Sequence, residues 1–523
     1  MFARAVQRRA TGVCEVEYGR VFPCRRHQRR LASGLACALM LLAVGGAACG
    51  LRPEPLAIDR LKPCTSDEGP TDAYCGTLTV FENRDTRQGR TIDLKIVVLP
   101  ALGNDAAPDP LFFLAGGPGQ GAAKMARQVR DLFGRIQARR DIVLVDQRGT
   151  GDSNGLECRS DDDSLASIYE SDEAGLERLK TCLAGYDADT RFYTTPIAMD
   201  DLDDVRAFLG YEMINIYGGS YGTRAALVYL RQHEARVRAV VLDGVAPTDM
   251  RLPLYFARDA QRALDRLLAD CAADAPCAAR YPNLAERVRA LFARLEATPP
   301  TMRLTHPRTG VAEVVQVKAE LVANMVAGAL YSPLLSSLVP ELLARAEADD
   351  FQGMLATATT GEGAGENMSA GMQLSVICAE DAPLVTEADI ARESAGSVFA
   401  RHLLASRLKA CEFWPKGAVP ASYYDPVQSN VPVLVLSGDL DPVTPPSWGE
   451  AVAAHLPNAR HITAPATGHG VVGTGCGLRL IAAFVDKGTT DAVDTSCLAS
   501  MKRPPFVLGP AGPDPAPGAA PTP

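Results

Sequence analysis

The chain has 523 residues, of which 47% are hydrophobic, and its formal net charge is −9. Its length exceeds that of one ordinary domain, although a single core with a large insertion fits, and its apolar content is ample for a buried core. An acidic chain lacks the basic surface with which proteins bind nucleic acid, and nothing in it indicates charge-driven membrane binding.

The first 48 residues have the pattern of an export signal. Four arginines between positions 25 and 30 precede the apolar run 31–44, and small residues follow at 46–48. A basic segment, an apolar run too short to span a bilayer and then small residues are typical of a secretory signal peptide. Removing this segment takes away eight arginines and two glutamates, so the formal charge falls to −15.

Cys49 is a candidate for lipid modification. It follows Gly46-Ala47-Ala48, where lipoprotein processing would leave an N-terminal cysteine. Ordinary cleavage near Ala48 is the alternative. We therefore predict an exported bacterial protein, either a cell-envelope lipoprotein or a secreted or periplasmic protein.

Residues 49–75 are predicted to form an N-terminal arm, and a core of alternating strands and helices follows over residues 76–246. Its expected elements are strands 76–81, 91–99, 111–114 and 142–145 and helices 124–139 and 196–209. We expect the first two strands to pair antiparallel at the sheet edge. The alternation that follows predicts a mostly parallel sheet with helices on both faces.

Ser220 lies at the centre of Gly218-Gly219-Ser220-Tyr221-Gly222, between the apolar run 213–217 and the helical pattern 223–233. A G-x-S-x-G sequence between a strand and a helix is typical of the nucleophile elbow of an α/β-hydrolase. The small residues allow the strand and the helix to approach each other closely. The alternative is a glycine-rich turn that holds an ordinary serine.

After strand 239–242 the alternation of strands and helices stops between residues 247 and 430. Amphipathic runs at 258–273, 284–296 and 317–330 predict a helical cap. Because this insertion lies between the loops that follow the sixth and seventh strands, it would cover Ser220.

The core resumes over residues 431–507, and the expected catalytic acid and base lie there. The apolar run 431–436 predicts a buried parallel strand that ends in a turn with Asp439 and Asp441. We predict that Asp441 is the acid, because it lies deeper in the turn, and Asp439 is the fallback. Of the seven histidines, His469 has the best context for the base, in a glycine-containing loop after strand 460–463.

A helix at 477–485 completes the predicted core. Residues 508–523 are rich in proline, glycine and alanine and are expected to form a disordered tail.

An oxyanion hole needs two backbone N–H donors close to the serine. The first expected donor is Tyr221, which follows the nucleophile. The second is Gly117 in the loop 115–119 after strand 111–114, since Pro118 has no N–H.

Ten of the fourteen cysteines follow Cys49 and fall into near-neighbour pairs. In an exported chain they predict disulfides, and although the sequence cannot fix their connectivity, local pairing is the simplest. The expected pairs are Cys64–Cys75, Cys158–Cys182, Cys271–Cys277, Cys378–Cys411 and Cys476–Cys497. No C-x-x-C pair or nearby histidine cluster supports the alternative of a zinc site, so we expect no metal and no cofactor.

Five motifs together resemble the proline iminopeptidase and tripeptidyl aminopeptidase branch of the α/β-hydrolases. They are GGPG, DQRGTGDS, GGSYGT, GDLDPVTP and a late GHG. The resemblance covers roughly residues 60 to 500. Proline iminopeptidases usually have histidine where this chain has Ala115, so the tripeptidyl aminopeptidases are the closer match. Within DQRGTGDS, Asp146 and Arg148 are expected to hold the loops near the site.

This resemblance implies a serine peptidase that releases short N-terminal peptides through an acyl-enzyme. The segment that contains Glu380 and Asp381 resembles a cap segment of the tripeptidyl aminopeptidases. The resemblance therefore implies that these two carboxylates hold the α-amino group of the peptide substrate. Solvated charges beside a disulfide are the alternative for this pair. An exported esterase or lipase with the same triad, or a non-catalytic binding protein of the same fold, are the alternative functions.

Overall fold

The computed structural model describes residues 60–66, 69–159, 164–165, 172–360, 368–400 and 402–509. The chain divides into two units, residues 1–54 and 55–523, and all described residues belong to the second. The predicted signal peptide, Cys49 and the tail from residue 510 onward therefore lie outside the described residues.

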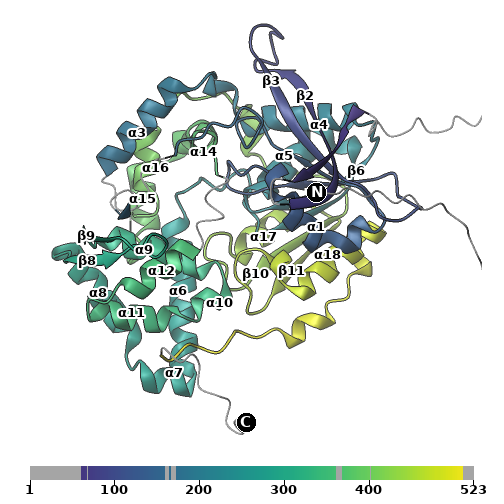
Figure 1. Ribbon diagram of the computed structural model, residues 1–523. Coiled ribbons are helices and arrows are strands. Elements are labelled where there is room, and N and C mark those ends of the chain that lie inside the picture. Colours follow the sequence, from purple (N-terminus) through teal and green to yellow (C-terminus); the bar gives the residue numbers. More distant parts are fainter. Residues whose placement is uncertain are drawn as a thin grey trace, which may run out of the picture. The chain divides into compact units, whose positions relative to one another are not determined.

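In the described part of the chain, nine strands form one sheet in the order β1-β2-β3-β5-β4-β6-β7-β10-β11 (Figure 1). Their bounds are β1 Lys62–Ser66, β2 Gly69–Phe81, β3 Thr91–Leu99, β4 Leu111–Leu114, β5 Ile142–Val145, β6 Ile214–Gly219, β7 Val237–Asp243, β10 Val433–Gly438 and β11 Ala459–Ala464. β1 to β3 pair antiparallel, as do β3 and β5. All pairs from β5 to β11 are parallel, which confirms the predicted mostly parallel sheet.

The edge of the sheet differs from the prediction. β1 and the first part of β2 lie in the segment expected to be an arm, and the disulfide Cys64–Cys75 joins these two strands. The sequence of β1, KPCTS, has no alternation of apolar and polar residues, so its strand character depends on backbone pairing with β2.

Two layers of helices bury the two faces of the sheet. Their bounds are α1 Ala126–Gln137, α4 Thr195–Phe208, α5 Tyr221–His233, α17 Pro446–Ala453 and α18 Gly475–Lys487. Neighbouring residues of a strand point to opposite faces. Phe112 accordingly packs with α4 and α5, whereas Phe113 packs with α1 and α18. Burial on both faces explains why the central strands are apolar runs rather than alternating ones.

Between β7 and β10 the chain forms the predicted helical cap, with a hydrophobic cluster of its own. Its helices are α6 Phe256–Ala273, α7 Ala275–Arg280, α8 Leu284–Ala297, α9 Ala319–Leu330, α10 Pro333–Ser336, α11 Val339–Glu347, α12 Gln352–Thr360, α14 Ala370–Val376, α15 Glu387–Glu393 and α16 Ala405–Ala410. The shorter helical turns of the chain are η2 Ala123–Met125, η3 Thr190–Phe192, η4 Glu234–Arg236, the π-helical η5 Ile377–Asp381, η6 Ala382–Leu384, η7 Ala421–Tyr424, η8 Val471–Gly473, η9 Thr490–Ala492 and η10 Ser496–Ser500.

Two elements beside the cap core were not predicted. The hairpin of β8 (Thr301–Thr305) and β9 (Ala312–Gln316) buries one residue in each strand, which leaves little sequence signal. Helix α3 (Asp172–Gly185) packs on α14 and α16 through Leu176, Leu179 and Leu183. The helical spacing of these leucines was a signal that could have identified α3.

The C-terminal segment 501–508 also departs from the predicted boundaries, because it leaves the core and crosses to the cap (Figure 1, yellow). Arg503 pairs with Asp270 of α6 at 2.8 Å, and Phe506 is buried in the hydrophobic cluster of the cap. The backbone N–H of Val507 donates to the carbonyl of Ser337 at 3.1 Å. This segment therefore ties the end of the core to the cap.

The described residues contain five disulfides, and their pairing confirms the prediction. Cys378–Cys411 joins η5 to the end of α16 within the cap. Cys476–Cys497 joins α18 to η10 after the loop that carries His469.

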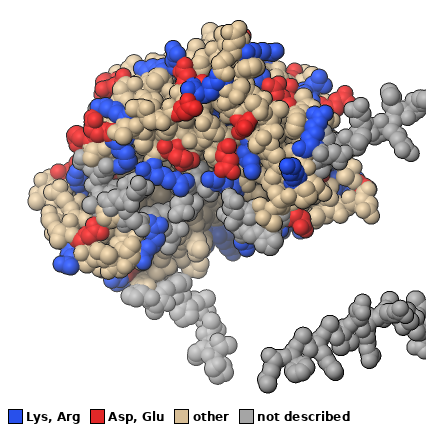
Figure 2. All heavy atoms as spheres, turned by 45° about the horizontal axis from the view of Figure 1, so that its top comes forward, with Lys and Arg blue, Asp and Glu red and all other residues tan. Residues whose placement is uncertain are grey.

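Acidic and basic side chains are interspersed on the face drawn in Figure 2. Of the helices that the structure describes, none combines the length and the apolar character needed to cross a bilayer.

Candidate active site

Ser220 forms a strained turn between β6 and α5, as its glycine-rich surroundings predict. Its φ of 55° and ψ of −123° are unusual for a residue with a side chain. A Cβ atom at Gly218 would lie 2.3 Å from the carbonyl oxygen of Gly222. A Cβ atom at Gly222 would lie 2.3 Å from the carbonyl oxygen of Leu114. Only glycine allows the strand and the helix to meet this closely, so the turn presents Ser220 at the carboxyl end of β6.

His469 and Asp441 are in direct contact. His469 Nδ1 lies 2.8 Å from Asp441 Oδ2, and the side chain of Asp441 is fully buried. Asp439, the fallback acid, contacts the backbone N–H of Thr467 instead, at 3.2 Å. Because an ionised carboxylate can only accept hydrogen bonds, Nδ1 carries the proton and Nε2 keeps its lone pair.

The environment of this pair favours its charged form. Burial acts to lower the pKa of His469, but the charge and hydrogen bond of Asp441 outweigh burial and raise the pKa above its ordinary value. Burial acts to raise the pKa of Asp441, but the charge of His469 and the hydrogen bonds to the carboxylate outweigh it and lower the pKa. The imidazole is thus poised to become imidazolium beside a carboxylate that stays ionised.

Thr444 supports Asp441, and sequence reasoning missed this role. Its hydroxyl donates to Asp441 Oδ2 at 2.8 Å and lies 3.1 Å from His469 Nδ1. The backbone N–H groups of Val443 and Thr444 both donate to Oδ1 at 2.8 Å. Thr444 lies within the GDLDPVTP motif, but the sequence does not show which of its side chains turns toward the acid.

Asp243, at the end of β7, holds the loop that carries His469. It accepts hydrogen bonds from the backbone N–H groups of Val471 and Val472 at 2.7 and 2.8 Å and from the hydroxyl of Tyr217 at 2.9 Å. Burial raises its pKa. Its position at the carboxyl end of a central strand was the only sequence signal for this role.

The expected oxyanion donors lie in the two turns beside the serine. A Cβ atom at Gly116 would be 3.2 Å from Ser220 Cβ, so the loop of Gly117 adjoins the nucleophile. Gly117 has a φ of 111°, and Tyr221 is the first residue of α5. Within the described residues no acceptor takes up the N–H of either residue, so both donors are available to an oxyanion.

Asp146 and Arg148 hold loops, as the sequence led us to expect. Asp146 accepts from the backbone N–H groups of Ala123 at 2.7 Å and Asp152 at 2.9 Å, and burial raises its pKa to about 6. The buried guanidinium of Arg148 donates twice to Asp201, at 2.6 and 2.9 Å. Both side chains are therefore satisfied by the protein itself.

Glu380 and Asp381 lie in η5 and are almost completely buried, with exposures of 0% and 1%. Arg224 of α5 donates to both oxygens of Asp381, at 2.9 and 3.1 Å. Glu380 accepts from the backbone and the hydroxyl of Thr195 at 2.6 and 2.9 Å and from the hydroxyl of Tyr423. The Thr195 hydroxyl is in turn 2.7 Å from that of Tyr221. This network joins the cap to the elbow helix, and whether it also binds substrate stays a prediction.

The cap contacts both catalytic loops directly. The backbone N–H of His469 donates to the carbonyl of Tyr331, at the end of α9, at 2.9 Å. The two rings meet edge to face, with centroids 5.0 Å apart. Arg262 of α6 donates to the carbonyl of Asp441 at 2.5 Å. The amphipathic patterns that predicted the cap gave no indication of these contacts.

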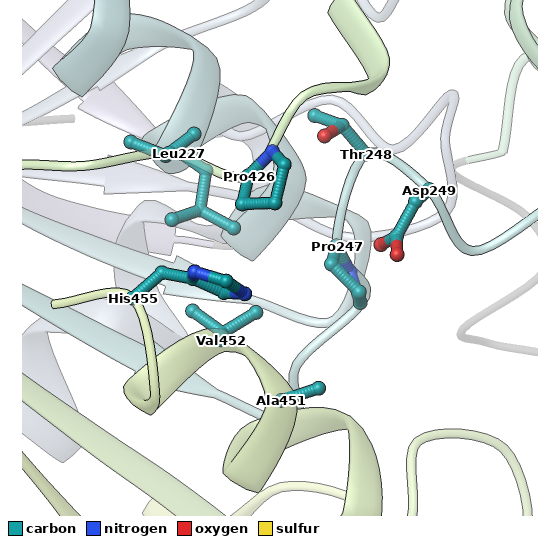
Figure 3. Close-up of a pocket in the computed structure, with 9 residues that line it drawn as sticks. Leu227, Pro247, Thr248, Asp249, Pro426, Ala451, Val452 and His455 are labelled. Carbon is teal, nitrogen blue, oxygen red and sulfur yellow. The ribbon is translucent and has the colours of Figure 1, made fainter.

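A small cavity of about 60 Å³ lies between α5, α17 and two loops (Figure 3). It is lined by Leu227, Pro247, Thr248, Asp249, Pro426, Val427, Ala451, Val452 and His455. Ligand pockets usually have volumes of about 300–1,000 Å³, so this cavity cannot hold a peptide. None of the predicted site residues lines it.

Two family models match the chain. The model described as alpha/beta hydrolase fold matches residues 109–316, and the model described as TAP-like protein matches residues 396–497. The first range contains Ser220 and Gly117, and the second contains Asp441 and His469.

Three relatives are similar to this chain. Serine protease Hip1 of Mycobacterium tuberculosis is 28% identical over 504 residues, which cover 88% of this chain and 96% of that protein. Proline iminopeptidase of Neisseria gonorrhoeae is 30% identical over 136 residues, or 26% of this chain and 32% of that protein. Tripeptidyl aminopeptidase of Streptomyces lividans is 28% identical over 220 residues, or 39% of this chain and 41% of that protein. The chain therefore has the α/β-hydrolase fold, and its C-terminal region is similar to the family described as TAP-like protein.

Proposed function

We propose that this chain is an exported serine peptidase that releases short peptides from the N-terminus of its substrates. The observation that carries the proposal is the hydrogen bond of 2.8 Å between His469 and the buried Asp441 in a chain that also presents Ser220 on a nucleophile elbow. The similarity to a serine protease over 88% of the chain supports peptides as the substrate class.

The catalytic cycle follows from the properties of these groups. Ser220 Oγ attacks the scissile carbonyl carbon while His469 Nε2 takes the hydroxyl proton, and Asp441 stabilises the resulting imidazolium. The N–H groups of Gly117 and Tyr221 donate to the oxyanion. The imidazolium then protonates the departing amine, an acyl-enzyme remains on Ser220, and a water activated by His469 hydrolyses it.

We retain Glu380 and Asp381 as the proposed anchor for the α-amino group of the substrate. Two carboxylates face one guanidinium in this cluster, and a substrate ammonium would balance the excess charge. Burial raises the pKa of Asp381 to about 7, and a nearby cation would favour its ionised form. We expect N-acetylation of a peptide to reduce its cleavage strongly. Equal cleavage of the acetylated and the free peptide would leave the cluster with a structural role alone.

Export and the lipid anchor are part of the proposal. Five disulfides fit an oxidising compartment outside the cytosol. A lipid-modified Cys49 at the mature N-terminus would attach the enzyme to the cell envelope. Intact mass spectrometry tests this, because acyl chains add mass to the mature chain. A mature N-terminus beyond Cys49 would exclude the anchor.

The experiment that tests the function compares chromogenic tripeptide amides with short-chain esters, using Ser220→Ala as the control. We expect amide hydrolysis that the serine variant loses. Ester hydrolysis without amide hydrolysis would favour the esterase alternative. Failure to cleave either class would favour a binding protein of the same fold.

A further inference from the structure

Arg407, on α16 of the cap, has a charge that no acidic side chain neutralises in the part of the chain that the structure describes. Its Nε donates to the side-chain oxygen of Gln373 at 3.3 Å and its Nη1 to the carbonyl of Leu403 at 3.2 Å. Both acceptors are neutral, and no ion pair joins Arg407 to an Asp or Glu among the residues that the structure describes. Arg148 and Arg224 differ in this respect, because each pairs with a buried carboxylate.

This charge is costly where it lies. Burial lowers the pKa of Arg407, but an arginine remains protonated at neutral pH because its ordinary pKa lies far above 7. A half-buried guanidinium loses hydration, and charge-assisted hydrogen bonds are the usual compensation. Of its five N–H groups, two have acceptors in the described structure. The remaining donors are available to a ligand.

Arg407 is linked through Gln373 to the loop of the oxyanion donor. Gln373 lies on α14, and the backbone N–H of Ser369, just before α14, donates to the carbonyl of Gly119 at 2.9 Å, in the loop that carries Gly117. Burial raises the pKa of Tyr331, at the end of α9, and the charge of Arg407 opposes this. The Tyr331 ring packs against His469 with a centroid distance of 5.0 Å and is 41% exposed. In acyl transfer the histidine delivers its proton to the departing amine. Groups of the cap that surround His469 therefore flank the leaving fragment of the substrate.

We propose that Arg407 binds the C-terminal carboxylate of the departing fragment, so that the enzyme selects short peptides with a free C-terminus close to the cleaved bond. A guanidinium is suited to this role because its planar N–H groups match a carboxylate, and the ligand would supply the counter-charge that the described residues do not provide. The inference rests on the proposed peptidase function and deepens it.

The test uses the full chain and three peptides with the same N-terminal residues. The first has a one-residue leaving fragment with a free carboxylate, and the second is its C-terminal amide. The third carries glutamate in an amidated leaving fragment. We expect kcat/KM of the wild-type enzyme to be about 10- to 100-fold higher for the free carboxylate than for its amide, the range that charge-assisted hydrogen bonds provide.

The variants assign that preference to Arg407. We expect Arg407→Gln to lower kcat/KM for the free carboxylate to that for the amide while leaving cleavage of the amide unchanged, and Arg407→Lys to keep part of the preference. Arg392→Gln is the matched control, because Arg392 lies on the cap with 60% of its side chain exposed and pairs with Asp389 and Glu393. It should behave as wild type.

Equal cleavage of the free carboxylate and its amide by the wild-type enzyme, or a preference that survives in Arg407→Gln, would overturn the inference and leave the peptidase proposal standing. Preference for the glutamate amide over the free C-terminus would overturn the assignment to the terminal carboxylate. Failure of the wild-type enzyme to cleave any of the three peptides would instead contradict the peptidase function itself.

Discussion

Replacing Asp441 with asparagine tests the assignment of the acid, and the structure sets the size of the effect. Asp441 Oδ1 accepts from two backbone N–H groups, which an amide oxygen can still do. Oδ2 accepts from the hydroxyl of Thr444 and from His469 Nδ1. In the variant, an NH₂ group takes the place of Oδ2 and must donate. The Thr444 hydroxyl can rotate to accept, but His469 can accept only if Nδ1 loses its proton.

The imidazole would then carry its proton on Nε2 and could not act as the base for Ser220. We expect kcat for a tripeptide amide to fall by about 10⁴-fold, which corresponds to about 5 kcal/mol in the activation barrier. The backbone contacts of the turn remain, so thermal unfolding should show a folded protein.

The pH profile gives an independent readout. Because Asp441 raises the pKa of His469, wild-type kcat/KM should increase with pH through a pKa above the ordinary 6.5. Loss of the carboxylate should move this limb to lower pH.

Asp439→Asn is the matched control, since Asp439 lies two residues away and accepts from the backbone N–H of Thr467, in the loop that carries His469, rather than from the imidazole. We expect it to lower kcat by less than about tenfold, within the usual effect of a single hydrogen bond. If Asp439→Asn were the crippling change and Asp441→Asn mild, the assignment of the acid would be refuted.

Three further changes test how the site and the cap are held. Thr444→Val removes a hydrogen bond to a buried carboxylate and should lower kcat by roughly 10-fold in the same assay; a change below about twofold would contradict its supporting role. For Asp146, whose folded pKa is about 6 against an ordinary 3.8, ionisation opposes folding as the pH rises from 4 to 6. The unfolding free energy of Asp146→Asn should therefore decrease less between those pH values than that of wild type, by roughly 2–3 kcal/mol, and parallel pH profiles would refute this. The double variant Cys378→Ser/Cys411→Ser opens a loop of sequence separation 33 and should lose about 3–4 kcal/mol in denaturant unfolding; an unchanged midpoint would show that the disulfide does not stabilise the cap.

Local sequence patterns predicted most of the core and the three central residues of the site. G-x-S-x-G requires a tight strand-to-helix crossing. A Cβ atom added at Gly218 or Gly222 would lie 2.3 Å from a backbone carbonyl oxygen, which shows why no larger residue fits. Asp441 and His469 each follow a strand of the parallel sheet, and the carboxyl ends of such strands meet at one edge. Near-neighbour cysteine spacing likewise predicted all five disulfides.

Other features depend on contacts between segments far apart in the chain, for which a single sequence carries no signal. Asp243 lies 228 residues from Val471 and accepts a hydrogen bond from its backbone N–H. Glu380 lies 185 residues from Thr195, whose backbone N–H donates to it. Two adjacent acidic residues suggest a solvent-exposed segment, and only the folded structure shows that this segment is buried. The polar strand β1 and the segment that crosses from the core to the cap depend in the same way on partners elsewhere in the chain.

The sequence by itself therefore determined the fold class and the candidates for the nucleophile, the acid and the base, because each depends on spacing within one short segment or on the order of strands. It favoured local disulfide pairs without fixing their connectivity. Only the tertiary structure decided what surrounds these groups. It placed Tyr331 against His469, hydrogen-bonded Thr444 to Asp441 and left Arg407 without a carboxylate partner among the described residues. Those relations arise when the cap folds onto the sheet, since burial and charge pairing are properties of packed neighbours rather than of residues along the chain.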